Sequence, residues 1–230
     1  MSDEKHWQAV YEKKETDAVS WYRPHLDRSL AFIRAAKLPL DARIVDVGGG
    51  ASTLIDDLLK EGYENLAVVD LAEAALKRSQ ARLGDAASQV DWISGDVTTS
   101  IFPDASVDFW HDRAVFHFLT EPKARAAYLG QVLRSVKPGG SVLVATFGLD
   151  GPKTCSGLPV AQYDAEGIHS VFGDAFEKLG EASEIHQTPW GSEQSLRQRV
   201  RDGFPLSAPS SHSSSSPTEP SPHSPRTDTA

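Results

Sequence analysis

The stretch Ile44–Thr53, which reads IVDVGGGAST, decides the fold of this 230-residue chain. An apolar strand that carries Asp46 runs directly into three glycines, which let the backbone turn sharply and approach a ligand closely. The next residues, LIDDLL from Leu54, have a helical pattern, and Ser52 or Thr53 can cap that helix. Because free N–H groups at a helix start favour anions, the stretch predicts a ligand-binding strand, turn and helix. A tight turn without a ligand would have the same local pattern.

Two later strands also end in acidic residues. Leu66–Val69 leads into Asp70, which lies 70 − 46 = 24 residues after Asp46, where a carboxylate can accept the hydroxyls of a ribose. Val90–Ile93 is followed by Asp96. Since ligands of open α/β sheets bind at the carboxyl ends of the strands, the three acids predict a site for adenosine.

Two classes of cofactor suit such a site, and the glycine turn separates them. A dinucleotide-binding turn has a third glycine, but Thr53 occupies that position, which disfavours an NAD-dependent oxidoreductase. The acidic first strand, the glycines and the two later acids resemble class I S-adenosylmethionine-dependent methyltransferases. The resemblance implies S-adenosylmethionine as cofactor, with contacts at Asp46, Gly48, Gly49, Gly50, Asp70, Leu71, Asp96 and Val97.

The resemblance covers roughly residues 5–195. Ser106–Arg113 looks like a fourth strand, and the KPGG sequence from Lys137 looks like the turn before a fifth, since proline stops a helix and glycines reverse the chain. The implied fold is α/β, a Rossmann-like, doubly wound and mostly parallel sheet with helices on both faces and an N-terminal helical lid. We expect a lid at 1–40, a methyltransferase domain at 41–202 and a disordered Ser/Pro-rich tail at 203–230.

The N-terminal segment is rich in aromatic residues. Trp7 and Tyr11 are one helical turn apart, and Trp21 lies in a loop before Pro24. The block resembles an N-terminal H-W-x-x-x-Y…V-S-W-Y segment of a bacterial branch of the methyltransferases, which folds over the cofactor. The resemblance implies cofactor contacts at Tyr11, Ser20 and Trp21. A packed amphipathic helix is the alternative.

Residues at the end of the fourth strand are the candidates for catalysis. His111 can titrate near neutral pH and act as a general base, Asp112 can contact the cofactor amine or cap a helix, and Arg113 can bind an acidic acceptor or pair with Asp112. Related eukaryotic lysine methyltransferases carry acid, lysine and glycine here, whereas this chain has Asp112-Arg113-Ala114. The methyl acceptor and the type of methylation therefore stay open, and a module that binds the cofactor without catalysis is a further alternative.

Composition limits the classes of partner and the cellular compartment that we expect for the chain. A net charge of −9 disfavours a nucleic-acid backbone as partner. No apolar run approaches the roughly 20 residues of a membrane span. A single cysteine, Cys155, fits a reducing compartment, so we expect a cytoplasmic protein. Adjacent His111 and Asp112 would face opposite ways on a strand, so no metal site is expected. Nothing in the sequence sets the oligomeric state.

The C-terminal sequence departs from the family pattern. Ser183–Trp190 reads as a sixth strand, after which relatives add an apolar antiparallel strand between the fifth and the sixth. Here Leu196–Arg201 reads LRQRVR, which puts arginines on one face of any strand. Because a buried unpaired charge is costly, we expect at most a short strand near 193–200, nothing ordered beyond about Phe204, and a terminus that is either natural or frameshifted.

Overall fold

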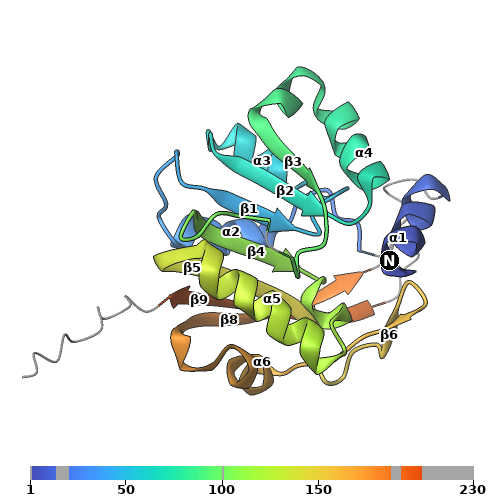
Figure 1. Ribbon diagram of the computed structural model, residues 1–230, viewed down its shortest axis with the longest axis vertical. Coiled ribbons are helices and arrows are strands. Elements are labelled where there is room, and N and C mark those ends of the chain that lie inside the picture. The colour runs from blue at the N-terminus through green and yellow to red at the C-terminus, as the bar shows by residue number, and fades with distance from the viewer. Residues whose placement is uncertain (1, 14–20, 100, 188–192, 204–230) are drawn as a thin grey trace, which may run out of the picture.

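The computed structural model describes residues 2–13, 21–99, 101–187 and 193–203. These residues form a seven-stranded sheet of order β3-β2-β1-β4-β5-β9-β8 (Figure 1). β3, β2, β1, β4 and β5 run parallel, as the sequence predicts, and β9 runs antiparallel to both neighbours. The strands of this sheet are β1 (Ile44–Val47), β2 (Leu66–Asp70), β3 (Val90–Ser94), β4 (Val107–Arg113), β5 (Val136–Phe147), β8 (Phe176–Gln187) and β9 (Glu193–Gly203).

Helices cover both faces of the sheet. Successive residues of a strand point to opposite faces. Val45 accordingly packs in one core cluster with Tyr128 of α5, whereas Ile44 packs in another with Ile33 of α2 and Leu58 of α3. Within the described residues, no helix is long and apolar enough to cross a membrane. The helices are α1 (Ser2–Lys13), α2 (Asp27–Ala35), α3 (Leu54–Lys60), α4 (Glu73–Leu83), α5 (Pro122–Ser135) and α6 (Ala165–Phe172).

Local signals set the helix starts. Asp164 caps α6, with its carboxylate accepting a hydrogen bond from Gly167 N at 2.7 Å. Pro122 stands in the first turn of α5, where its missing N–H is not needed. The cap residue of α5 is Glu121.

The expectation of a short strand near residues 193–200 is wrong. β9 is 11 residues long; it pairs with β8 from Glu193 to Gly203 and with β5 from Leu196 to Asp202. The prediction used only the polarity of side chains, whereas the backbone groups of β9 find partners on two neighbouring strands. Residues beyond Gly203 lie outside the described part, and so does the expectation for them.

A small hairpin outside the sheet was not anticipated. β6 (Thr154–Cys155) pairs with β7 (Leu158–Pro159). Ser156 and Gly157 connect the two strands with positive φ angles of 50° and 80°. Two consecutive positive φ angles suit the twist of a tight hairpin, and the Ser-Gly pair was the available sequence signal.

Candidate functional site

A cavity of about 380 Å³ lies where the parallel strands end. Residues that directly follow four strands line it, namely Gly48 after β1, Leu71 after β2, Gly95 after β3 and Ala114 after β4. Figure 1 shows α1 at the edge toward which these strands point. The cavity therefore occupies the position at which open α/β sheets bind ligands.

The glycine turn forms one wall of this cavity. Gly48 has φ +65°, and a Cβ atom there would lie 2.0 Å from Val115 Cγ2. At Gly50 a Cβ atom would lie 2.5 Å from Ala75 Cβ and 2.6 Å from Asp70 Oδ2. Side chains at these two positions would collide with β2, α4 or the loop after β4, so glycine is required for packing as well as for access to a ligand.

Asp70 is held rigidly at the end of β2. Its Oδ2 accepts a hydrogen bond from Gly50 N at 3.1 Å, and its Oδ1 accepts one from Ala72 N at 2.8 Å. The residue is 8% exposed, and burial raises the pKa of its carboxyl to about 6 despite these bonds. Each oxygen keeps a second lone pair, so the carboxylate can still accept two hydroxyl groups from a ligand in the cavity.

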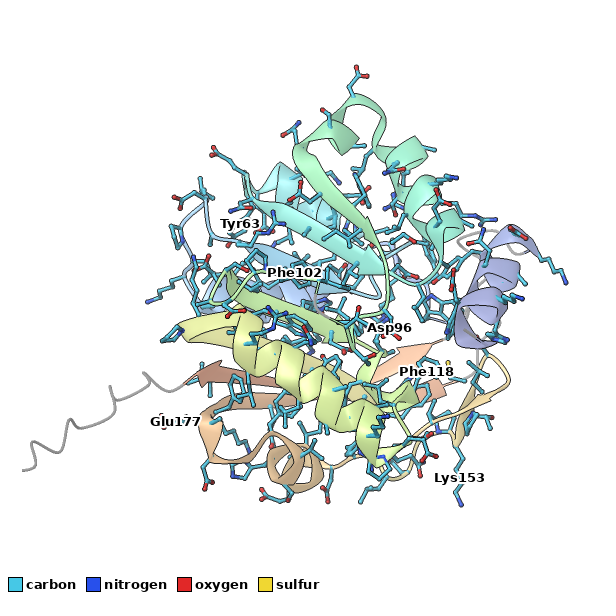
Figure 2. All side chains as sticks on the ribbon, in the orientation of Figure 1. Tyr63, Asp96, Phe102, Phe118, Lys153 and Glu177 are labelled. Atoms are coloured by element: carbon cyan, nitrogen blue, oxygen red, sulfur yellow. The ribbon has the colours of Figure 1, made fainter. Side chains whose placement is uncertain are left out.

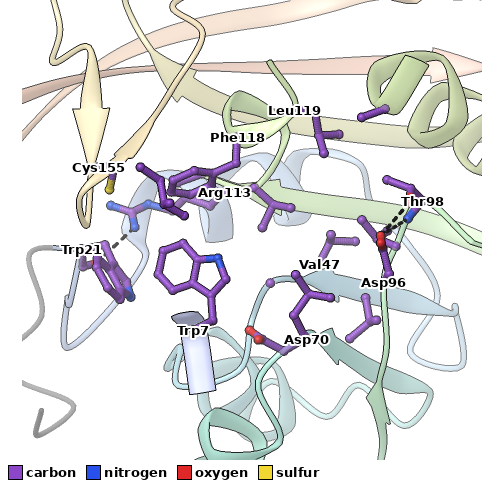
Figure 3. A pocket seen from close by; sticks show the side chains of 18 of the residues that line it. Trp7, Trp21, Val47, Asp70, Asp96, Thr98, Arg113, Phe118, Leu119 and Cys155 are labelled. Atoms are coloured by element: carbon purple, nitrogen blue, oxygen red, sulfur yellow. Dashed lines mark hydrogen bonds between the residues drawn. The ribbon is translucent and has the colours of Figure 1, made fainter. Parts of the chain in front are cut away.

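Asp96 occupies the neighbouring part of the wall. Its Oδ1 accepts hydrogen bonds from Thr98 N at 2.8 Å and from Thr98 Oγ1 at 2.7 Å, which fixes the carboxylate beside the cavity (Figure 3). Val97 follows and is buried against the same cavity. Asp70 and Asp96 thus form an acidic end to the site.

His111, the predicted general base, is held by two buried hydrogen bonds. It is 0% exposed, and its ring nitrogens lie 2.7 Å from Asp46 Oδ1 and 2.8 Å from Ser29 Oγ. Both nitrogens are therefore occupied, and the ring does not line the large cavity. His111 connects β1 and β4 to α2 and also lines the recess of about 40 Å³ beside the cavity, so its action as a base stays a prediction. Asp46 Oδ2, by contrast, is buried without a hydrogen-bond partner in the described structure.

Asp112 also points away from the cavity. Its Oδ1 accepts from Val115 N at 2.9 Å, and its Oδ2 accepts from Phe116 N at 3.1 Å and from the Tyr128 hydroxyl at 2.7 Å. The predicted contact with cofactor or acceptor stays a prediction, and these bonds favour its alternative, because they hold the N–H groups at the start of the 3-10 helix Phe116–Phe118. Burial raises the pKa of the Asp112 carboxyl to about 6.

Asp112→Asn should flatten the dependence of stability on pH. The carboxyl has a pKa of about 6 when folded and an ordinary value near 3.8, so the unfolded chain releases its proton first as pH rises. Wild-type stability therefore falls between about pH 4 and pH 6, by on the order of 3 kcal/mol, and the variant should lack this loss. Urea unfolding of both proteins at pH 4.5 and 7 measures the difference. An equal change with pH in the two proteins would contradict the account.

Aromatic residues close the cavity on the side of α1. The Trp7 ring lies 5.7 Å from that of Trp21 and 5.1 Å from that of Phe118, both edge to face. Tyr11 is 5% exposed and its ring lies 6.1 Å from that of Trp21. Edge-to-face contacts of this kind stabilise one another, so the segment packs as a unit over the cavity. Ser20, the third predicted contact, lies outside the described residues.

Arg113 and the hairpin complete the wall opposite Asp70 and Asp96. Arg113 Nη1 donates to the carbonyl oxygen of Trp21 at 3.2 Å, which ties the loop after α1 to the end of β4. In Figure 3, Arg113 extends toward Trp21 and Cys155. Sequence reasoning missed this part of the wall, which includes Phe118, Phe147, Cys155, Leu158 and Pro159.

The structure brings most of the predicted cofactor residues together. Gly50 and Asp112 line neither the cavity nor the recess of about 40 Å³ beside it. Gly50 instead supports Asp70 from behind through its N–H. Direct contact with a cofactor stays a prediction for the residues that do line these spaces, which are Tyr11, Trp21, Gly48, Asp70, Leu71, Asp96 and Val97 in the cavity and Asp46 and Gly49 in the recess.

Comparison with known proteins assigns the central part of the chain. Residues 44–140 match a methyltransferase domain family. This segment is similar to methyltransferase domains. It contains the glycine turn, Asp70, Asp96 and Arg113, so one end of the cavity and part of the other belong to the domain itself. S-adenosylmethionine is the cofactor of this domain.

Relatives of the domain act on different acceptors. The eEF1A lysine and N-terminal methyltransferase of Bos taurus is 24% identical over 204 residues, which are 88% of this chain and 27% of that protein. The ubiquinone/menaquinone biosynthesis C-methyltransferase of Roseobacter denitrificans is 31% identical over 108 residues, which are 46% of this chain and 42% of that protein. The chain thus spans less than half the length of these curated relatives.

A solved structure shares the fold. The 1,6-didemethyltoxoflavin-N1-methyltransferase of Burkholderia thailandensis, solved with 1,6-didemethyltoxoflavin and S-adenosylhomocysteine, matches with a TM-score of 0.61 at 18% identity. The match covers 88% of this chain and 84% of that one. At this identity the likeness establishes the fold and not the acceptor.

The described residues fit this cofactor. The Asp70 carboxylate can accept hydroxyl groups, a second carboxylate stands at Asp96, and Gly48 lines the cavity without a side chain. The recess adds Asp46, whose buried Oδ2 can accept a bond from an ammonium group. When bound, the cofactor supplies a methyl group that is electrophilic because it is bonded to a positively charged sulfonium sulfur.

Proposed function

We propose that this chain transfers a methyl group from S-adenosylmethionine to an acceptor that is a small molecule or a protein side chain. One observation carries the proposal: the glycine turn and two strand-end carboxylates face the same cavity that an aromatic segment closes. The carboxylates suit a nucleoside, and the closed aromatic side suits a reaction from which water is excluded.

The chain's own residues have distinct tasks in this proposal. Asp70 accepts the ribose hydroxyls while Gly50 N and Ala72 N hold its carboxylate in place. Asp46 faces the ammonium group of the amino-acid part, and His111 keeps that carboxylate oriented. Trp7, Tyr11 and Trp21 exclude water, and their electron-rich ring faces favour the sulfonium cation.

Catalysis in this proposal depends on positioning. His111 and Asp112 are committed to buried hydrogen bonds, so neither is assigned a proton transfer. Alignment of an acceptor with a reactive carbon can by itself remove a large part of a barrier. Arg113 is retained as a residue that orients the acceptor.

Two measurements test the proposal. Calorimetry with S-adenosylmethionine, S-adenosylhomocysteine and NAD should show binding of the first two only. Incubation of the protein and methyl-labelled S-adenosylmethionine with an extract of cells that lack the protein should then label an acceptor. Binding of NAD in their place would support an oxidoreductase. Cofactor binding without any labelled product would support a module that binds without catalysis.

The oxidoreductase alternative is also disfavoured by packing. Thr53, at the position of the third glycine of a dinucleotide-binding turn, is buried and donates from its Oγ1 to the carbonyl oxygen of Arg23 at 3.0 Å. The side chain fills the place where a dinucleotide-binding turn needs close helix packing. The comparisons likewise favour the methyltransferase.

A further inference from the structure

The end of the cavity away from Asp70 and Asp96 has a distinct chemical character. Apart from Arg113, the described side chains there are apolar, aromatic or a thiol. Arg113 carries the one positive charge among the described residues that line the cavity. The residues of this end, which we call the acceptor wall, are Trp7, Trp21, Arg113, Phe118, Phe147, Cys155, Leu158 and Pro159.

Arg113 is built into this wall by the fold. It ends β4, where backbone pairing with β5 fixes its register opposite Ala145. Its Nη1 donates to the Trp21 carbonyl oxygen at 3.2 Å, so the guanidinium is held beside the aromatic segment. Figure 3 shows it directed away from both Asp70 and Asp96, which lie across the cavity. Arginine stays charged at all physiological pH values.

Two titratable side chains near Arg113 are neutral at pH 7: Cys155 of the acceptor wall, and His117, which packs against Phe118 and Phe147 of that wall. Burial raises the pKa of the Cys155 thiol to about 11, so the residue carries no negative charge near pH 7. His117 is 0% exposed and its ring centroid lies 4.5 Å from that of Phe118 and 4.7 Å from that of Phe147. Burial, and secondly the charge of Arg113, lower the pKa of His117 to about 3.

These observations define what the acceptor wall can bind. A flat apolar group can pack against Trp7, Trp21 and Phe118, while an anionic group on it can reach the guanidinium of Arg113. An ammonium group would meet a like charge in surroundings that screen it poorly. The wall is therefore matched to an aromatic anion and mismatched to a lysine side chain.

We propose that the acceptor wall binds a flat aromatic acid, with its carboxylate or an equivalent oxyanion held by Arg113. This inference rests on the proposed function, because it names the acceptor class of the same site. It concerns recognition only: the oxyanion anchors the acceptor. It departs from the lysine specificity stated in the name of the Bos taurus relative.

The test uses three probes of one shape and different charge: 2-naphthoate, 2-naphthamide and 2-naphthylmethylamine. Each is titrated by calorimetry at pH 7 into the full chain saturated with S-adenosylhomocysteine. Naphthoate is expected to bind about tenfold or more tightly than the amine, which corresponds to one charge-assisted hydrogen bond. Failure of naphthoate to bind, or equal binding of acid and amine, overturns the inference.

Variants separate the charge of Arg113 from its structural contact. Arg113→Gln should bring the affinities for acid and amine within about twofold of each other, whereas Arg113→Lys, which keeps the charge, should retain the preference. Arg134→Gln is the matched control, because Arg134 also donates to a backbone carbonyl, that of Phe102, but does not line the cavity. An undiminished preference in Arg113→Gln overturns the inference.

A last comparison tests whether Arg113 binds the acceptor or the amino-acid carboxylate of the cofactor. S-adenosylhomocysteine has an amino-acid carboxylate, and 5′-methylthioadenosine lacks it. If Arg113 held that carboxylate, Arg113→Gln would weaken binding of the former alone, and this outcome overturns the inference while leaving the proposed function intact. Unchanged affinity of Arg113→Gln for both compounds supports the inference. Absence of S-adenosylhomocysteine binding by the wild-type chain would remove the proposed function and the inference together.

Discussion

Asp70→Ala is expected to lower the affinity for S-adenosylmethionine at least about thirtyfold, or ~2 kcal/mol. The variant removes the acceptor of the two ribose hydroxyls and also frees Gly50 N and Ala72 N, which the carboxylate holds at 3.1 and 2.8 Å. The glycine turn would then lose the contact that sets its distance from β2. Calorimetry at pH 7.5 measures the loss.

Two controls belong to this experiment. Asp108→Ala removes a carboxylate that likewise accepts from a backbone N–H, that of Arg43 at 2.8 Å, but lies outside the cavity, and it should leave the affinity unchanged. Hydroxyl donors of the cofactor favour the charged form of Asp70, and burial raises the pKa of this carboxyl to about 6 in the protein without cofactor. Wild-type affinity should therefore also weaken as pH falls from 7 to 5. Asp70→Ala with wild-type affinity would refute the role of this residue.

Removal of residues 1–23 is expected to leave a folded domain with turnover lowered by about a hundredfold. The deletion takes away Trp7, Tyr11 and Trp21, which cover the cavity, but none of the strands of the sheet. It breaks contacts that do not join strands of the sheet to one another, such as the bonds from Ala74 N to Gln8 Oε1 at 3.1 Å and from Thr53 Oγ1 to the Arg23 carbonyl oxygen at 3.0 Å. Transfer of label from S-adenosylmethionine, together with a circular dichroism melt, measures both effects.

The single cysteine offers a second readout of this deletion. Cys155 lines the cavity, so its reaction with a maleimide at pH 8.5 should become faster when the aromatic segment is absent. The milder variant Trp21→Ala should lower turnover more than it lowers the melting temperature. Full activity in the deleted chain, or a loss of stability in Trp21→Ala without a loss of activity, would refute the function of the segment as a lid.

The parts of the fold that follow from short-range patterns could be predicted from the sequence. Asp70 and Asp96 end apolar runs, and parallel strands must bring such ends to one edge. The turn at Gly48 and the Asp164 cap similarly depend on a few adjacent residues. These features needed no knowledge of how distant segments pack.

The roles of His111 and Asp112 depended on contacts across the fold. Both end the same strand, but their side chains face opposite layers, one toward Ser29 of α2 and the other toward Tyr128 of α5. The presence of those partners could not be inferred from the local sequence. Titratable residues at one strand end therefore lie in different places: Arg113 lines the large cavity, His111 lines only the recess, and Asp112 lines neither.

The position of β9 has a consequence for synthesis of the chain. In the sheet order, β8 pairs with β9, and β9 separates it from β5. While the ribosome is still making residues 193–203, the 12-residue β8 has no partner strand in its final arrangement, and β5 is open on one edge. Exposed strand edges invite pairing with other chains. The nascent protein therefore keeps two unpaired strand edges until β9 emerges, and chaperone binding in that interval would protect it from aggregation.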